Sequence, residues 1–324
     1  MYLDFFQLRE FPFSTTCDGR FFYESAVHAE ALANMMYTAQ QRKGMVLVTG
    51  EVGAGKTFLG SMLGERLGPA CKTVVTQNPP QSPKQLLRAV AGGVGLSVRA
   101  RADKLSLVEG LEEHLQRMHS RGRLVVLVVD EAQDLPATAL EELRLLWNWE
   151  QGGQRLVQMV LIGQPELRRK LVEPKWEPLR QRIVLSYHLG PLSADDTRAY
   201  IEHRLDVASE NGRGVEFGPE AMEDIYGATD GIPRLINVLC DNSLLAAYAN
   251  SLRRIERPLI REVLRDMTCW DLQSPCEAPP AGAGAPASDR SGGHGERLEI
   301  HEAARGGCGR EDRVRGDRPG EPFG

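Results

Sequence analysis

The 324-residue sequence lacks the long apolar segments of membrane and secreted proteins. Its longest strongly apolar run, at residues 124–129, is far shorter than the roughly 20 residues of a membrane-spanning helix. The first residues, Met1 to Asp4, contain neither the basic region nor the apolar region of a signal peptide. These absences predict a cytoplasmic chain with no transmembrane segment.

Cysteine patterns and an excess of positive charge are also missing. No two cysteines have C-x-x-C spacing and none has a histidine at metal-ligand spacing, which argues against a zinc site or a disulfide framework. The formal net charge of −5 argues against a surface that binds nucleic acid throughout, although a local basic face is compatible with that sum. The composition, 42% hydrophobic and 26% charged, is that of an ordinary folded protein.

Bulky apolar side chains become rare after residue 272. The 52 residues that follow hold 11 of the 33 glycines and only four bulky apolar side chains. Such a segment cannot bury enough apolar surface to offset the entropy lost on folding. Residues 268–324 are therefore predicted to be a disordered tail rich in glycine, proline and arginine.

Between residues 43 and 190, apolar β-branched runs alternate with amphipathic helical patterns, which indicates a parallel sheet with crossover helices. Strands are expected at residues 45–49, 73–77, 124–130, 156–163 and 183–189. Helices are expected at residues 57–67, 83–94, 106–119 and 137–149. The pattern predicts an α/β domain, a five-stranded parallel sheet with helices on both faces.

Two further segments flank this domain. Residues 1–42 form an aromatic-rich arm that leads into a helix from about Ser25. After Pro191 the strand pattern disappears, and Ser193 followed by the acid Asp196 predicts a helix N-cap. Three or four helices in residues 191–267 are expected to form a helical lid subdomain.

A phosphate-binding motif follows the first expected strand. Residues 50–57 fit the pattern G-x-x-x-x-G-K-[ST], at the start of a helix as that motif requires. Glycines let the backbone N–H groups wrap around phosphates, and the helix N-terminus adds a positive dipole end. Lys56 would reach the β- and γ-phosphates of ATP, and the Thr57 hydroxyl would bind Mg²⁺. The residues expected to bind the nucleotide here are Gly50, Glu51, Val52, Gly53, Ala54, Gly55, Lys56, Thr57 and Phe58.

The apolar run at residues 124–129 ends in two acids, Asp130 and Glu131. In open α/β sheets, ligands bind at the carboxyl ends of the strands, where these acids would lie. We expect Asp130 to assist Thr57 in binding Mg²⁺ and Glu131 to polarise the attacking water.

Four more residues are expected in the site because of their positions. Gln164 is the first hydrogen-bonding side chain after the fourth strand and could hold the attacking water. Arg180 and Arg182 precede the fifth strand, and one of them could reach the site of a neighbouring subunit as an arginine finger. Arg182 directly precedes the strand, and this position favours it over Arg180 as the arginine finger. Arg234 follows Pro233 at the start of a lid helix, which would point it towards the nucleotide.

Together these features resemble an AAA+ ATPase. More narrowly, residues 5–13 (FFQLREFPF), 41–44 (QRKG), 129–133 (VDEAQ) and 162–167 (IGQPEL) resemble the general secretion pathway protein A (ExeA-type) ATPases. The similarity covers residues 1 to about 267. It implies an oligomeric ATPase that serves a secretion, pilus or exopolysaccharide envelope system through a protein partner, peripheral at the inner membrane.

The chain departs from that family in two ways. Longer members continue into a membrane helix and a periplasmic peptidoglycan-binding domain, which this sequence lacks, so cell-wall binding is not expected. The triplet Cys17-Asp18-Gly19 stands where the family usually has Pro-Asp-Pro, which affects the arm and not the ATP site.

Two other hypotheses stay open. One is a DNA-transaction ATPase of the transposition-helper or origin-recognition kind, which the segment from Asp130 to Gln133 also resembles. Against it, no helix-turn-helix pattern follows the lid, and residues 1–272 carry a net charge of −3. The other is a nucleotide-binding scaffold that barely hydrolyses ATP, which would have lost a catalytic group, whereas Lys56 and Glu131 are present.

Overall fold

The structure, a computed structural model, describes residues 2–16, 18–210, 212 and 214–268. The predicted disordered tail therefore lies outside the described residues, apart from its first position. Cys17 in the arm lies outside them as well.

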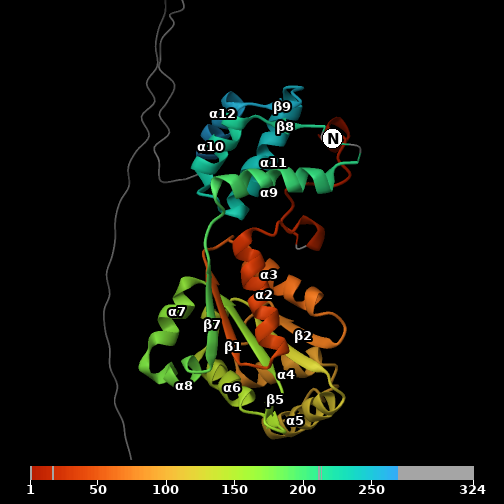
Figure 1. Cartoon of the computed structure of the whole chain (residues 1–324), viewed down its shortest axis with the longest axis vertical. Helices are drawn as coiled ribbons and strands as arrows, with labels where there is room; N and C mark the ends of the chain where they lie inside the picture. The colour runs from red at the N-terminus through yellow and green to blue at the C-terminus, as the bar shows by residue number, and fades with distance from the viewer. Residues whose placement is uncertain (1, 17, 211, 213, 269–324) are drawn as a thin grey trace, which may run out of the picture. The chain divides into compact units, whose positions relative to one another are not determined.

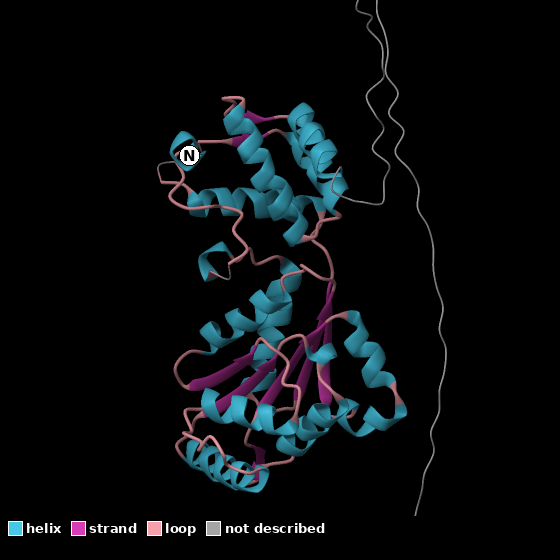
Figure 2. Ribbon diagram, turned by 180° about the vertical axis from the view of Figure 1, so that it is seen from behind, coloured by secondary structure: helices cyan, strands magenta, loops and turns pink. Residues whose placement is uncertain are grey.

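A parallel sheet of five strands forms the centre of the α/β domain. The strands are β1 (Met45–Gly50), β2 (Cys71–Thr76), β3 (Leu124–Val129), β6 (Gln158–Gly163) and β7 (Ile183–Leu189). They lie side by side in the order β2-β3-β6-β1-β7 (Figures 1 and 2). Because every pair is parallel, the carboxyl ends of the strands meet at one edge of the sheet, and the loops that follow them collect there.

Helices cover both faces of the sheet, since alternate side chains of a strand point to opposite faces. Val46 and Val48 of β1 pack in one core with α2 (Ala26–Gln40) and α3 (Lys56–Leu67). Met45 belongs to a second core on the other face. Its helices are α4 (Pro83–Gly93), α5 (Lys104–Ser120), α6 (Ala137–Trp147), α7 (Pro165–Val172) and α8 (Glu177–Arg180). Burial on both faces explains why the central strands are continuous apolar runs in the sequence.

The observed elements differ from the prediction mainly after α6. The helix expected at 137–149 ends at Trp147, and a two-stranded antiparallel hairpin follows it. The hairpin consists of β4 (Glu150–Gln151) and β5 (Gln154–Arg155). Gly152 and Gly153 form its turn with φ angles of 59° and 75°, a conformation that glycine adopts without strain. Strands of two residues are too short for an alternating pattern to reveal them.

Four helices form the lid. They are α9 (Ala194–Ala208), α10 (Pro219–Thr229), α11 (Pro233–Ala249) and α12 (Arg257–Thr268), with a short parallel pair, β8 (Glu216–Phe217) and β9 (Arg254–Ile255). The Ser193 side chain accepts a hydrogen bond from the backbone N–H of Asp196, which confirms the predicted N-cap. Pro233 is the first residue of α11, as the sequence predicted.

The N-terminal arm packs into the core of the lid. Tyr2 and Phe6 of α1 (Tyr2–Phe6) are buried there with Phe13 and the lid residue Ile201. The arm continues through a 3₁₀ turn, η1 (Gly19–Phe21), into α2. Two further 3₁₀ turns, η2 (Ala132–Asp134) and η3 (Pro174–Trp176), lie in the α/β domain. The arm therefore links the lid core to the helix that precedes β1.

The fold prediction is confirmed: a five-stranded parallel sheet carries helices on both faces and is followed by a helical lid. Within the part of the chain that the structure describes, no helix is both long enough and apolar enough to cross a bilayer.

Candidate nucleotide-binding site

The phosphate loop, residues 50–57, follows β1 and wraps around the N-terminus of α3. Gly53 and Gly55 have φ angles of 84° and 88°, which turn their backbone in a way that side chains oppose. Gly55 is the N-cap of α3, and Lys56 is its first residue. The loop therefore presents backbone N–H groups and a helix N-terminus together, the arrangement that binds phosphate.

Lys56 lies buried beneath this loop. Its Nζ atom donates hydrogen bonds to the carbonyl oxygens of Gly50 and Glu51, both at 2.8 Å. Burial lowers the pKa of Lys56, and the nearby carboxylates of Glu131, Asp130 and Glu51 partly oppose that shift. The ammonium is thus held by neutral carbonyls that a phosphate could replace.

Thr57 and Asp130 contact each other across the sheet edge. Thr57 Oγ1 donates a 2.6 Å hydrogen bond to Asp130 Oδ2. Burial raises the pKa of Asp130. Hydroxyl and carboxylate oxygens are the donors that Mg²⁺ prefers, so this pair fits the ion that accompanies ATP. The described residues contain no cluster of three acidic, histidine or cysteine side chains that could hold a metal ion.

Glu131 follows Asp130 in a left-handed conformation with a φ of 48°. Its Oε2 accepts a 2.6 Å hydrogen bond from Gln133 Nε2 and a longer one, 3.5 Å, from Gln164 Nε2. The Oε1 of Gln133 in turn accepts from the backbone N–H of Gln164 at 3.0 Å. The predicted pair Glu131 and Gln164 is therefore brought together, and Gln133 joins them.

The role of Gln133 was missed by sequence reasoning. The residue appeared only as the end of a family-like segment, because nothing in a lone glutamine after two acids indicates its partners. Lys170 of α7 donates to the carbonyl oxygens of Gln133, at 2.9 Å, and Leu135, at 2.5 Å. The loop after β3 is thus fixed to α7.

Arg234 brings the lid to the phosphate loop. Its backbone N–H donates to the Gly53 carbonyl at 3.4 Å, and its side chain is exposed at the N-terminus of α11. The predicted approach of Arg234 to the phosphate loop is therefore present in the fold.

A cavity of about 440 Å³ joins these parts. Its walls come from the phosphate loop, Glu131, the lid and the N-terminal arm. The Phe22 ring stacks on Phe58 at 5.2 Å and meets His28 edge-on at 5.8 Å. His28 Nδ1 is 2.7 Å from Ser25 Oγ, and burial lowers the pKa of this imidazole. Phe58 is thus part of an aromatic wall that the motif alone did not indicate.

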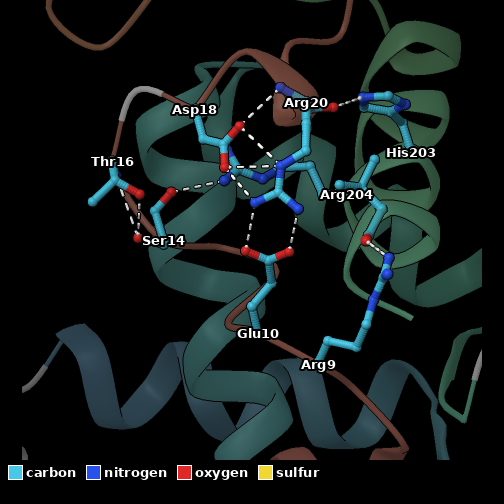
Figure 3. Close-up of polar contacts among 9 residues, drawn as sticks. Arg9, Glu10, Ser14, Thr16, Asp18, Arg20, His203 and Arg204 are labelled. Atoms are coloured by element: carbon cyan, nitrogen blue, oxygen red, sulfur yellow. Dashed lines mark hydrogen bonds and ion pairs between the residues drawn. The ribbon is translucent and has the colours of Figure 1, made fainter. Parts of the chain in front are cut away.

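The arm is held in place by charged side chains. Arg20 of η1 donates to both carboxylate oxygens of Glu10, at 2.8 and 2.9 Å, and also contacts Asp18 (Figure 3). Arg204 of α9 binds the carbonyl oxygen of Ser14 at 2.7 Å. The arm therefore forms a fixed side of the cavity, which sequence reasoning had left unassigned.

Arg180 and Arg182 lie away from this cavity. Ile183 pairs with Met45 at the amino ends of β7 and β1, whereas the phosphate loop follows the carboxyl end of β1. Neither arginine lines the cavity of its own chain.

The two arginines differ in how they are held. Arg182 is half-buried, packs over the Trp147 ring at 5.2 Å and donates to Asn148 Oδ1 at 3.1 Å. Burial also lowers its pKa. Arg180 is exposed and donates a hydrogen bond to the carbonyl oxygen of Val172. This geometry favours Arg180 as the freer side chain, in contrast to the preference for Arg182 drawn from the sequence.

Comparisons with known proteins agree with this architecture. Residues 39–171 match a family model described as an AAA domain. The chain is 40% identical over 257 residues to General secretion pathway protein A of Aeromonas hydrophila, a match that covers 79% of this chain and 46% of that protein. The chain thus spans about half the length of this curated relative.

Solved structures show the same fold. The ORC2 protein of Aeropyrum pernix, in ADPNP and ADP complexes, superposes with a TM-score of 0.61 at 18% identity, covering 79% of this chain and 71% of that one. The RuvB Holliday junction branch migration motor of Thermotoga maritima gives 0.53 at 18%, covering 74% and 68%. Together with the matched AAA domain, the phosphate loop and the sheet order show an AAA+ fold, in a chain that is similar to General secretion pathway protein A.

Proposed function

We propose that the chain binds and hydrolyses ATP with Mg²⁺, and that it acts as a homo-oligomer to drive assembly of a secretion, pilus or exopolysaccharide envelope system. The observation that carries the hydrolysis proposal is the convergence of Lys56, the Thr57–Asp130 pair and Glu131 at one sheet edge, with Arg234 above the phosphate loop.

In this proposal, Lys56 exchanges its two carbonyl partners for phosphate oxygens when ATP binds. Glu131 accepts a proton from water as the water oxygen bonds to the γ-phosphorus, and the bond from that phosphorus to the bridging oxygen breaks. The electron pair leaves with ADP, and inorganic phosphate is the second product. Bound Mg²⁺ would neutralise phosphate charge at Thr57 and Asp130. Gln164 and Gln133 hold the Glu131 carboxylate in position.

The proposal of a homo-oligomer rests on the positive charges around the cavity. Among the described residues that line it, the cationic side chains are Lys56, Arg204 and Arg234. The Arg204 guanidinium is already hydrogen-bonded to the arm and to Tyr200. An arginine from a second copy, with Arg180 as the better candidate, would supply the guanidinium that stabilises the transition state. A single subunit would then hydrolyse slowly.

The envelope partner is inferred from the relative's name. General secretion pathway protein A is 40% identical over most of this chain, and we extend its involvement in secretion to this chain as a proposal. The corresponding location is the cytoplasmic side of the inner membrane, where ATP is supplied.

The alternative is an ATPase that works on DNA. RuvB of Thermotoga maritima is a Holliday junction branch migration motor, but at 18% identity the likeness is one of fold. The likeness to RuvB therefore favours neither an envelope assembly nor DNA as the partner of this chain.

The test is the ATPase rate of the full chain as a function of its concentration, with and without duplex DNA. A rate per subunit that rises with concentration and ignores DNA supports the secretion-type function. Stimulation by DNA that disappears as salt rises supports the alternative instead.

The catalytic assignment is tested with two variants. Lys56→Ala should abolish nucleotide binding, whereas Glu131→Gln should retain ATP without hydrolysing it. Hydrolysis by Glu131→Gln at the wild-type rate would contradict the catalytic assignment.

A further inference from the structure

A chain of hydrogen bonds runs from the arm through the lid to the cavity. It begins at Arg204 of α9, which is only 4% exposed. Its guanidinium donates to the carbonyl oxygens of Pro12, at 2.5 Å, and Ser14, at 2.7 Å, and to the Tyr200 hydroxyl at 2.8 Å. Figure 3 shows Arg204 beside this stretch of the arm. The arm backbone and Tyr200 are thus bound by the same side chain.

The direction of these bonds is fixed because arginine can only donate. The Tyr200 oxygen must accept from Arg204, so its single proton points elsewhere. That proton goes to Asn237 Oδ1, at 2.8 Å, and Tyr200 has no other acceptor in the described residues. Burial raises the pKa of Tyr200, which keeps the hydroxyl protonated. The amide oxygen of Asn237 is therefore occupied.

The amide nitrogen of Asn237 is available to donate hydrogen bonds. The side chain is 7% exposed and lines the cavity, and its nitrogen has no hydrogen-bond partner among the residues that the structure describes. Asn237 stands three positions after Arg234 on α11, which is one turn further from the phosphate loop on the same side of the helix. Because Asn237 lines the cavity, a ligand acceptor can reach this nitrogen, and a hydrogen bond between them would add affinity and specificity.

We propose that the Asn237 amide donates a hydrogen bond to an acceptor on the nucleoside half of the bound nucleotide, and that Arg204, acting through Tyr200, keeps the amide in the donating orientation. This inference rests on the proposed nucleotide-binding function. The acceptor is a purine ring nitrogen or a ribose oxygen, which share this chemistry. Asn237 is then a specificity residue, while Tyr200 and Arg204 position it.

The test is a thermodynamic cycle between one ligand atom and one residue. Dissociation constants are measured by calorimetry for the full chain with ADP, with 1-deaza-, 3-deaza- and 7-deaza-ADP, and with 2′-deoxy- and 3′-deoxy-ADP. The wild type should bind one analogue about tenfold more weakly than ADP, equivalent to about 1.4 kcal/mol. A sensitive deaza analogue identifies a ring nitrogen, and a sensitive deoxy analogue identifies a ribose oxygen.

The discriminating variant is Asn237→Asp, which retains the acceptor for Tyr200 and replaces the donor. If the sensitive analogue is a deaza-ADP, the ratio of its dissociation constant to that of ADP should fall from about ten to one or below. If it is a deoxy-ADP, Asn237→Ala takes the place of Asn237→Asp, because a ribose hydroxyl could donate a hydrogen bond to the new carboxylate. Repulsion between the new carboxylate and the phosphates cancels in this ratio, because both ligands carry the same phosphates. Asn242→Asp is the matched control, since Asn242 lies exposed on the same helix and donates to Val238. It should keep the wild-type ratio.

Tyr200→Phe tests the positioning role with the loss of one oxygen atom. It should lower the ratio part of the way towards one, because the amide is then free to rotate. A general loss of structure would weaken ADP and its analogues equally and leave the ratio unchanged. Equal ratios in the wild type, Asn237→Asp and Tyr200→Phe would overturn this inference while leaving the ATPase proposal intact. Failure of the wild type to bind ADP would instead contradict the proposed function itself.

Discussion

The Cβ atom of Arg234 lies 2.6 Å from the point that a Cβ atom on Gly53 would occupy. The Ile232 side chain comes within 3.2 Å of the same point, and the Gly53 carbonyl accepts a hydrogen bond from the backbone of Arg234. The first turn of α11 therefore rests directly on the phosphate loop. A side chain at position 53 would separate the lid from the nucleotide.

Gly53→Ala should weaken ADP binding by at least about tenfold, because the methyl group displaces Arg234 and a non-glycine residue at positive φ costs roughly 1–2 kcal/mol. Calorimetry with ADP measures the effect. Gly92→Ala is the control, since position 92 lies in α4 with no atom within 4 Å of its added methyl group. It should bind ADP as the wild type does. If both variants bound ADP equally, the contact between the lid and the loop would not contribute to affinity.

Much of the fold was predictable because burial leaves local patterns. β3 is buried on both faces and reads as an uninterrupted apolar run. The starts of α9 and α11 were predictable from Ser193 and Pro233, because a capping side chain and a proline at the first helical position act within one turn. The phosphate loop was predictable for the same reason, since its function depends on contiguous residues.

The nucleoside side of the site was not predictable, because its parts are far apart in the sequence. Arg204 meets Pro12 across 192 positions, and Tyr200 meets Asn237 across 37. No periodicity connects such residues, and only the fold brings the arm and the lid together. The choice between Arg180 and Arg182 was also inaccessible, since it depends on the packing of Arg182 against Trp147.

Gln133→Ala should lower kcat for ATP by about tenfold or more and leave KM within about twofold. The Gln133 amide holds Glu131 Oε2 at 2.6 Å, and Glu131 is the proposed general base, which contributes typically about 10²–10⁴-fold to such reactions. Gln133 does not line the nucleotide cavity, so substrate affinity should change little. Steady-state ATPase kinetics at fixed protein concentration separate the two parameters.

Gln151→Ala is the matched control for that variant. Gln151 also donates an amide hydrogen bond to a side-chain oxygen, that of Ser120, but on the exposed surface of the hairpin. It should keep the wild-type kcat. A rise in KM with an unchanged kcat in Gln133→Ala would show that Gln133 supports nucleotide binding and does not position the base.

Arg180→Ala should reduce ATP hydrolysis by roughly 100-fold or more without unfolding the chain, because its exposed guanidinium is proposed to act in a neighbouring subunit. Arg182→Ala should instead lower the free energy of unfolding by about 1–2 kcal/mol through loss of its contacts with Trp147 and Asn148. Thermal melts and ATPase assays distinguish these outcomes.

Mixing inactive Arg180→Ala and Glu131→Gln subunits should restore hydrolysis, because an interface between the two can combine an intact base with an intact arginine. The same mixture made with Arg182→Ala tests the assignment drawn from the sequence. If neither mixture exceeded the sum of its components, the site would not be completed by an arginine from a second copy.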